Sequence, residues 1–199
     1  MNRGLLIGLG IAAVLVAIAA VTFGGIYNGL VRAEEGVSEA WAQVENVYQR
    51  RLDLVPNLVE TVKGYAAHER ETLEKVIEAR SKITQINLPK SVFNDPQALT
   101  QFEEVQQGLS SALSRLLVVI EQYPDLKANQ NFLTLQSQLE GTENRIAVER
   151  RRFNEVAREF NTRIRIFPDS VVARLTGFQR KSYFAADEGA RVAPTVKFT

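Results

Sequence analysis

The chain has 199 residues, no cysteine and a formal net charge of +1, from 24 Lys and Arg against 23 Asp and Glu. The lack of cysteine excludes a disulfide framework, a thiolate zinc site and a lipid attached to an N-terminal cysteine. The balanced charge excludes nucleic-acid binding driven by excess positive charge. Arg3 is the only charged side chain before Arg32, which predicts an apolar membrane segment at residues 1–31 and a charge-balanced domain at residues 32–199.

Leu5–Ile26 is apolar except for Thr22, and as a helix it is long enough to cross the ~30 Å hydrocarbon layer of a bilayer. Ala17-Ile18-Ala19 has the pattern of a signal-peptidase site, but the apolar run exceeds the core of a signal peptide, so we expect an uncleaved signal anchor. Arg3 precedes the segment and Glu34 soon follows it, and the positive-inside tendency places the N-terminus in the cytoplasm. The sequence therefore predicts a single-pass protein of the inner (cytoplasmic) membrane with an extracytoplasmic domain.

Two glycine pairs in the apolar segment have the spacing at which membrane helices approach each other closely. Gly4 and Gly8 form the first pair, and Gly25 and Gly29 form the second. They predict helix packing in the membrane, through which the chain could form a homo-oligomer. The alternative is that these glycines reflect only the general abundance of glycine in membrane helices.

After residue 32, apolar side chains recur in alternating steps of four and three, the pattern of long helices packed side by side as in a coiled coil. The first series predicts one helix of roughly 50 residues, about 75 Å long. We expect a kink near Pro56, because proline removes a backbone donor, but no reversal of direction there. The members of this series are Val37, Trp41, Val44, Tyr48, Arg51, Val55, Leu58, Val62, Tyr65, Glu69, Thr72, Val76, Ala79, Ile83 and Ile86.

Three further helices follow from the same reasoning. Residues 95–123 and 129–167 have long apolar stripes, and residues 169–176 form a short helix that stops at Gly177. The fold class is therefore all-α: an N-terminal transmembrane helix, then an elongated antiparallel bundle of three long helices, a short fourth and an extended C-terminal tail. The aromatic residues expected to pack the tail on the bundle are Tyr183, Phe184 and Phe198.

The sequence offers little catalytic chemistry. Its one histidine, His68, is followed by Glu69, but Thr72 stands where a zinc peptidase motif needs its second histidine. A di-iron bundle also needs more than one histidine, and no serine forms a recognisable triad with His68. We therefore predict no enzyme activity, no metal and no cofactor. A hydrolase remains an alternative only if polar side chains converge around His68.

Polar residues recur every three or four positions on one face of each of two predicted helices, at residues 46–64 and 136–154. If these faces meet, they form a polar seam that fixes the register or contacts a partner. The alternative is two solvated faces with ordinary ion pairs. Asparagine is a poor helix former, which favours specific hydrogen bonds at some of these positions. The residues predicted to carry the interaction are Asp53, Asn57, Glu60, Glu140, Asn144 and Arg145.

Several stretches of the domain share their order of residues with one bacterial family. They are Glu34–Arg80, Tyr123–Glu155 with its core L-E-G-T-E-N-R at Leu139–Arg145, Phe167-Pro168, Lys181-x-Tyr183-Phe184 and Ala193-Pro194-x-Val196-x-Phe198. In these stretches the chain resembles the LemA family, over nearly the whole domain. The resemblance implies a bacterial single-pass membrane protein with a helical bundle and no established enzymatic activity. It also implies membrane-associated partners, among them membrane metallopeptidases and TPM-domain proteins, and one branch of the family takes part in forming magnetosome membranes.

These observations favour a membrane-anchored, non-enzymatic scaffold or adaptor of the cell envelope that acts through helix-mediated protein contacts. Its expected partners are the lipid bilayer and one or more envelope proteins, but not nucleic acid. The alternative is an extracytoplasmic binding module that holds a small or lipidic ligand within the bundle, which requires a pocket of about 300 Å³ or more.

Overall fold

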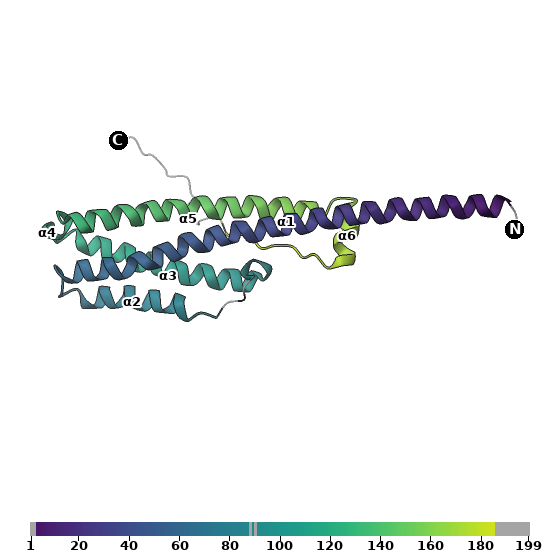
Figure 1. The fold of residues 1–199 in the computed structure, drawn as a ribbon. Coiled ribbons are helices and arrows are strands. Elements are labelled where there is room, and N and C mark those ends of the chain that lie inside the picture. The colour runs from purple at the N-terminus through teal and green to yellow at the C-terminus, as the bar shows by residue number, and fades with distance from the viewer. Residues whose placement is uncertain (1–2, 88, 90, 186–199) are drawn as a thin grey trace, which may run out of the picture.

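The computed structural model describes residues 3–87, 89 and 91–185. Within these residues the chain forms six α-helices and one 3-10 turn and no strand, which confirms the predicted all-α class. Figure 1 shows an elongated helical bundle from which the N-terminal part of the first helix projects alone.

The first helix, α1, runs without a break from Arg3 to Lys63, and at 1.5 Å per residue it is about 90 Å long. Its N-terminal part is long and apolar enough to cross a membrane, and the side chains there are not buried in the bundle. The chain does not reverse at Pro56, which lies inside α1. The predicted membrane segment and the first bundle helix are therefore parts of one continuous element.

The expectation of one helix reaching Ile86 is wrong. The chain turns back at residues 64–69, and a separate helix, α2, spans Arg70–Gln85. In the turn Ala66 is fully buried, whereas Tyr65, which the apolar series placed in the core, is exposed. Both arms of this hairpin have the same three-and-four spacing of apolar residues, so the spacing alone does not reveal the turn.

The other expected helices begin where the sequence indicates, but those predicted at residues 95–123 and 129–167 end earlier than expected, at Ile120 and Arg163, and a short helix at Pro124–Lys127 was not expected. Asp95 accepts a hydrogen bond from the backbone N–H of Gln97 at 2.8 Å, and Asn129 accepts one from Phe132 at 3.0 Å, so each caps a long helix. The last helix ends at Gly177, whose φ of 81° is a left-handed conformation that glycine adopts without strain. The elements after α2 are η1 (Val92–Asn94), α3 (Pro96–Ile120), α4 (Pro124–Lys127), α5 (Gln130–Arg163) and α6 (Asp169–Thr176).

The buried side chains form two clusters along the bundle. α5 lies antiparallel to α1 over most of its length, and α2 packs against α3 at the end far from the membrane segment (Figure 1). The proximal core, nearer the membrane segment, is rich in aromatic residues, and the distal core is mostly aliphatic. The proximal core includes Leu30, Val37, Trp41, Val44, Tyr48, Phe93, Phe102, Phe153, Phe160 and Phe184. The distal core includes Leu52, Val55, Leu58, Val62, Leu73, Val76, Leu109, Leu116, Phe132 and Leu139.

Trp41 lies at the centre of the proximal core. The centroids of four phenylalanine rings lie 5.3 to 5.8 Å from its own, and these rings come from η1, α3, α5 and the segment after α6. Such aromatic pairs contribute about 0.5–1.5 kcal/mol each beyond the area that they bury. One side chain of α1 thus joins four other parts of the chain. The four rings belong to Phe93, Phe102, Phe153 and Phe184.

Candidate functional site

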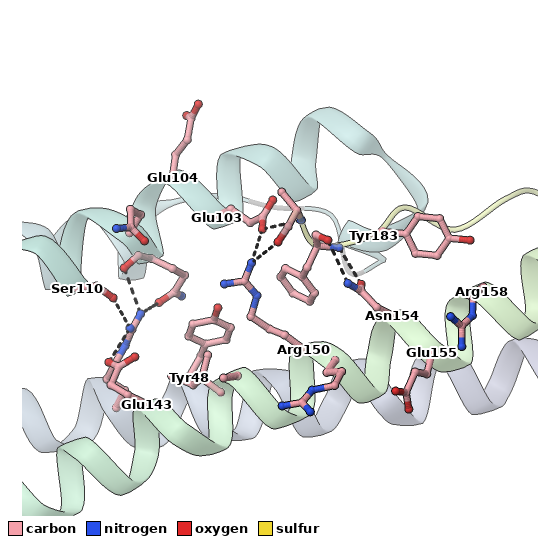
Figure 2. Close-up of a pocket in the computed structure, with 18 residues that line it drawn as sticks. Tyr48, Glu103, Glu104, Ser110, Glu143, Arg150, Asn154, Glu155, Arg158 and Tyr183 are labelled. Carbon is pink, nitrogen blue, oxygen red and sulfur yellow. Dashed lines mark hydrogen bonds and ion pairs between the residues drawn. The ribbon is translucent and has the colours of Figure 1, made fainter. Parts of the chain in front are cut away.

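A groove of about 1400 Å³ lies between α3 and α5 (Figure 2). α1 contributes Tyr48 and Arg51 to its lining, and Tyr183, Phe184 and Ala185 line it at one end. The remaining lining residues are mostly charged or amide side chains of α3 and α5. They include Glu103, Glu104, Gln106 and Gln107 of α3, and Glu143, Arg150, Arg151, Asn154, Glu155 and Arg158 of α5.

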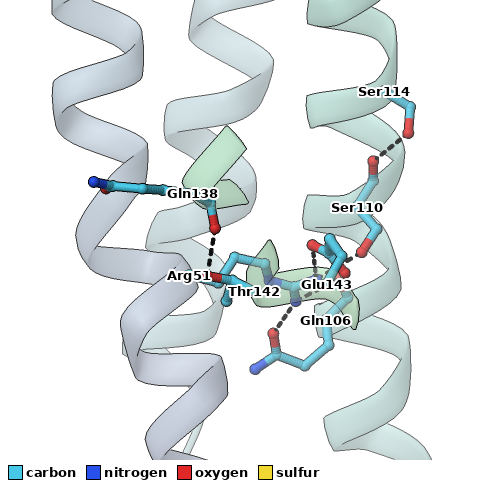
Figure 3. A network of polar contacts seen from close by, with 7 residues as sticks. All are labelled: Arg51, Gln106, Ser110, Ser114, Gln138, Thr142 and Glu143. Carbon is cyan, nitrogen blue, oxygen red and sulfur yellow. Dashed lines mark hydrogen bonds and ion pairs between the residues drawn. The ribbon is translucent and has the colours of Figure 1, made fainter. Parts of the chain in front are cut away.

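A buried arginine joins three helices beneath the groove (Figure 3). Nη1 of Arg51, on α1, donates to Oγ of Ser110 on α3 at 2.8 Å and to Oε1 of Glu143 on α5 at 2.9 Å. Its Nη2 donates to the backbone carbonyl of Gln106 at 3.2 Å and to the side-chain oxygen of the same residue. The guanidinium also lies 5.1 Å from the centroid of the Tyr48 ring, an attractive cation–π arrangement.

The two charges of this network differ in their access to water. The side chain of Arg51 is 1% exposed, while that of Glu143 is 41% exposed and lines the groove. A buried guanidinium is costly unless it is paired and hydrogen-bonded. The carboxylate of Glu143 therefore compensates the positive charge of Arg51, which is shielded from water. Burial raises the pKa of the nearby Tyr48 phenol, and the positive charges of Arg150 and Arg51 oppose that rise, so this hydroxyl stays protonated at neutral pH.

Residues 178–185, which we call the C-terminal strap, lie across the proximal half of the bundle. Two asparagines of α5 hold the strap by its backbone. Asn161 donates to the carbonyl of Lys181 and accepts from its N–H, both at 2.8 Å. Asn154 makes the same pair of bonds with Phe184, at 3.1 and 2.9 Å. The expected packing of Tyr183 and Phe184 on the bundle agrees with the strap, whereas Phe198 lies outside the described residues.

Charged side chains hold the strap near its middle and at its end. The ammonium of Lys181 is buried, and its Nζ lies 2.6 Å from Oε1 of Glu34 on α1 and also donates to Asn94. At the end of the strap, Arg150 pairs with Glu103 at 2.8 Å and donates to the carbonyl of Ala185 at 3.2 Å. This second pair crosses from α5 to α3 within the groove (Figure 2). The strap is thus part of the folded bundle and forms one wall of the groove.

We expect Asn161→Ala to release the strap and to lower the free energy of unfolding by about 2–3 kcal/mol, because three hydrogen bonds are lost at a buried site, two to the backbone of Lys181 and one to the hydroxyl of Tyr183. Hydrogen exchange at the amides of Lys181 and Phe184 measures the release. Asn144→Ala is the matched control, since Asn144 is exposed on the same helix. Equal exchange in the two variants would show that the carboxamide of Asn161 does not hold the strap.

The residues of the predicted polar seam are all exposed and lie outside the groove lining. Members of this set contact neighbours on their own helix, as Glu140 does in accepting a hydrogen bond from Gln136 at 3.0 Å. The antiparallel register brings Asp53 level with the members on α5, while Asn57 and Glu60 lie further toward the distal end. The seam remains a prediction, as the alternative surface to the groove. Its members are Asp53, Asn57 and Glu60 on α1 and Glu140, Asn144 and Arg145 on α5.

The four glycines proposed for membrane packing have different surroundings. A Cβ at Gly4, Gly8 or Gly25 would have no neighbour within 4 Å among the described residues. At Gly29 the guanidinium of Arg163 already covers the position, and its Nη1 donates to the carbonyl of Gly29 at 2.9 Å. The close approach at Gly29 therefore serves a contact inside the bundle, and packing between membrane helices through the other three remains a prediction.

His68 is exposed in the turn between α1 and α2, outside the groove. Next to it, Glu69 accepts a hydrogen bond from the hydroxyl of Tyr123 at 2.8 Å, which raises the pKa of that phenol. Within the part of the chain that the structure describes, no group of three or more His, Asp and Glu is arranged to hold a metal ion. The groove offers charged and amide side chains that can bind, but no nucleophile paired with a histidine.

The sequence pointed to some of this site and missed the rest. Asn154 is one of the asparagines whose poor helix propensity predicts a specific hydrogen bond, and Glu143 lies on the polar face of its helix. Arg51 was recognisable as a charged residue within an apolar series. The only sequence signal at Asn161 is that it is an asparagine within a helix, as for Asn154. Its partner, the backbone of Lys181, lies 20 residues further along the chain, where no local pattern points to it.

Comparisons with known proteins agree with the helical bundle and the apolar N-terminal helix. A family model described as the LemA family matches residues 40–198. Protein LemA of Metamycoplasma hominis is 29% identical over 168 residues, which cover 84% of this chain and 73% of that protein. Magnetosome protein MamQ of Magnetospirillum gryphiswaldense is 29% identical over 174 residues, or 79% of this chain and 64% of that protein. Magnetosome protein MamQ 2 of Paramagnetospirillum magneticum is 26% identical with the same coverage, so the chain spans less than two thirds of these magnetosome relatives.

Proposed function

Because the chain belongs to the LemA family, we propose that it is a membrane-anchored, non-enzymatic scaffold of the bacterial cell envelope. Its anchor is the apolar part of α1, and its binding surface is the groove between α3 and α5. The occupant of the groove is an extended segment of a partner protein. Two relatives named as magnetosome proteins support a role at a membrane.

The observation that carries the groove proposal is that α5 already binds one extended segment. Asn154 and Asn161, seven residues apart, each hold a backbone N–H and carbonyl of the strap. On α5 the groove runs from Glu143 to Arg158, so it lies beside the strap at one end and continues along α5 past Ala185. Side chains of mixed charge line it, and two exposed arginines of α5, Arg151 and Arg158, suit carboxylates of a partner.

A small or lipidic ligand is the second candidate. The volume of the groove exceeds the 300–1,000 Å³ typical of small-molecule pockets, which leaves room for such a ligand. Small-molecule pockets are mostly apolar and enclose most of their ligand, whereas this groove is open and charged. A protein segment fits that chemistry better.

Site-specific photo-crosslinking in membranes tests the proposal. A photo-reactive amino acid at Arg158 reports on the groove, and one at Asn144, on an exposed face of the same helix outside the groove, reports on the predicted seam. We expect a discrete protein adduct from position 158 and none from position 144. Adducts from position 144 alone would move the interaction to the seam, and only lipid adducts from position 158 would support the ligand candidate.

The proposed topology has its own prediction. The chain contains no cysteine, so Asn144→Cys supplies a single exposed thiol. We expect a membrane-impermeant maleimide to label this thiol in cells with a permeabilised outer envelope as fully as after lysis, because the domain lies outside the cytoplasm. Labelling that appears only after lysis would place the domain in the cytoplasm.

A further inference from the structure

Four large apolar side chains are exposed in one short stretch that comprises the turn after α5 and the helix α6. Phe167 is 82% exposed and Leu175 is 72% exposed. Val171 and Leu175 are four residues apart and so share the outer face of α6, while Val172 and Ala173 are buried in the proximal core. Neighbouring exposed apolar groups of this kind mark an interaction surface. We call this surface the elbow patch, and it consists of Ile166, Phe167, Val171 and Leu175.

The elbow patch lies where α1 leaves the bundle (Figure 1). The guanidinium of Arg163 donates to the carbonyl of Gly29 at 2.9 Å, which ties the end of α5 to α1. Beyond α6, the ring of Phe178 lies 6.0 Å from that of Tyr27. The patch is thus level with residues 26–30 of α1, immediately after the apolar stretch that ends at Ile26.

The charges around the elbow patch are basic. Arg165 and Arg174 are exposed beside it, and Arg174 lies three residues after Val171, so it borders the apolar face. The carboxylate of Asp169 is held by Arg163 at 2.7 Å, which offsets the one acidic residue of the turn. Apolar side chains bordered by arginine are the composition of helices that lie in the interface of a bilayer with anionic lipids.

We propose that the elbow patch is a second membrane contact. In it, Phe167 and Leu175 enter the interfacial layer of the leaflet nearer the bundle, where α1 leaves the membrane. The proposal rests on the membrane anchor of the proposed function. A lipid surface is the favoured occupant because the patch is continuous with the apolar stretch of α1 and its border is basic. Two points of attachment prevent the bundle from rotating about α1, so the groove faces a fixed direction relative to the membrane.

Fluorescence quenching in vesicles of phosphatidylethanolamine and phosphatidylglycerol tests this contact on the full chain. Since the chain has no cysteine, Leu175→Cys gives one thiol at the patch for a small apolar fluorophore. Val118→Cys is the matched control, because Val118 is 69% exposed on α3 beside the distal core. Leu15→Cys reports on the anchor itself. Each labelled protein is quenched with nitroxide lipids and, separately, with iodide in the water.

We expect nitroxide lipids to quench the label at position 175 severalfold more than the label at position 118, and Phe167→Ser to reduce that difference. Equal quenching at positions 175 and 118, with strong quenching at position 15, would overturn the membrane contact and leave the anchor intact. A label at position 175 that is shielded from iodide but not quenched by lipid would assign the patch to a protein, such as a second copy, and would also overturn it. Absence of quenching at position 15 would overturn anchor and contact together.

Discussion

We expect Trp41→Ala to be the most destabilising single substitution in the bundle. Trp41 is 3% exposed and is surrounded by aromatic rings from four other parts of the chain. Replacing a buried tryptophan with alanine costs about 3–5 kcal/mol, which for a chain of this size lowers the melting temperature by roughly 10 °C. Circular dichroism of the full chain in detergent micelles measures the change. Tryptophan fluorescence cannot follow unfolding here, because Trp41 is the only tryptophan of the chain.

Two controls separate loss of packing from other effects. Nε1 of Trp41 is buried without a hydrogen-bond partner among the described residues, so Trp41→Phe removes no hydrogen bond and should cost only about 1–2 kcal/mol. Val118→Ala, at an exposed position, should change stability by less than about 0.5 kcal/mol. If Trp41→Ala is as stable as Val118→Ala, the aromatic cluster does not hold the strap and the helices together.

The second large effect is expected at Arg51. Arg51→Ala removes four hydrogen bonds to α3 and α5, leaves the buried side chain of Gln106 without this donor and opens a cavity. Each of these losses costs free energy, and together they should lower the free energy of unfolding by about 3–4 kcal/mol. The fluorescence of Trp41, which lies in the same bundle, follows unfolding in this variant.

The neighbouring arginine supplies the matched control. Arg50 has the same side chain one position earlier but is exposed, so Arg50→Ala should change stability by less than about 0.5 kcal/mol. Arg51→Met preserves most of the volume and should recover part of the loss. Glu143→Ala should cost more than its exposure indicates, about 2 kcal/mol, because it leaves a buried guanidinium without its counter-charge. Equal stability of the Arg50 and Arg51 alanine variants would contradict this account of the network.

The sequence was sufficient for the features that depend on local chemistry. Helix caps at Asp95 and Asn129 and the stop at Gly177 follow from the backbone requirements of helix ends. The long apolar stretch and the all-α class follow from hydropathy and periodicity. The turn after Lys63 was missed because α2 continues the apolar spacing of α1; Gly64, directly after Lys63, is the one local signal of a helix end there.

The groove could not be predicted because it depends on contacts between distant segments. The Arg150–Glu103 pair, which crosses it, joins residues 47 positions apart, and its floor contains Arg51, whose partner Glu143 is 92 residues away. The predicted seam, whose residues are exposed, shows a second limit of prediction from periodicity. Periodicity tells which residues share a helix face, but not whether that face meets another helix or solvent.

The continuity of α1 fixes how the bundle is oriented relative to the apolar stretch. The helix passes from the apolar stretch into the proximal core without a break, and Leu30 is already buried against the bundle. A flexible linker would let the bundle turn freely above a membrane, whereas an unbroken helix transmits its orientation. A partner held in the groove would therefore be presented at a fixed distance from the bilayer.

The most direct measurement of the central claim, that the α3–α5 groove holds a partner protein, compares two charge reversals on α5. Co-purification from solubilised membranes is quantified for the full chain, for Arg151→Glu with Arg158→Glu in the groove, and for Arg145→Glu on the seam. All three arginines are exposed, so the substitutions should leave the fold intact. We predict that the partner is lost from the groove variant and retained by Arg145→Glu. A partner that stays with the groove variant, or leaves only with Arg145→Glu, would contradict the account.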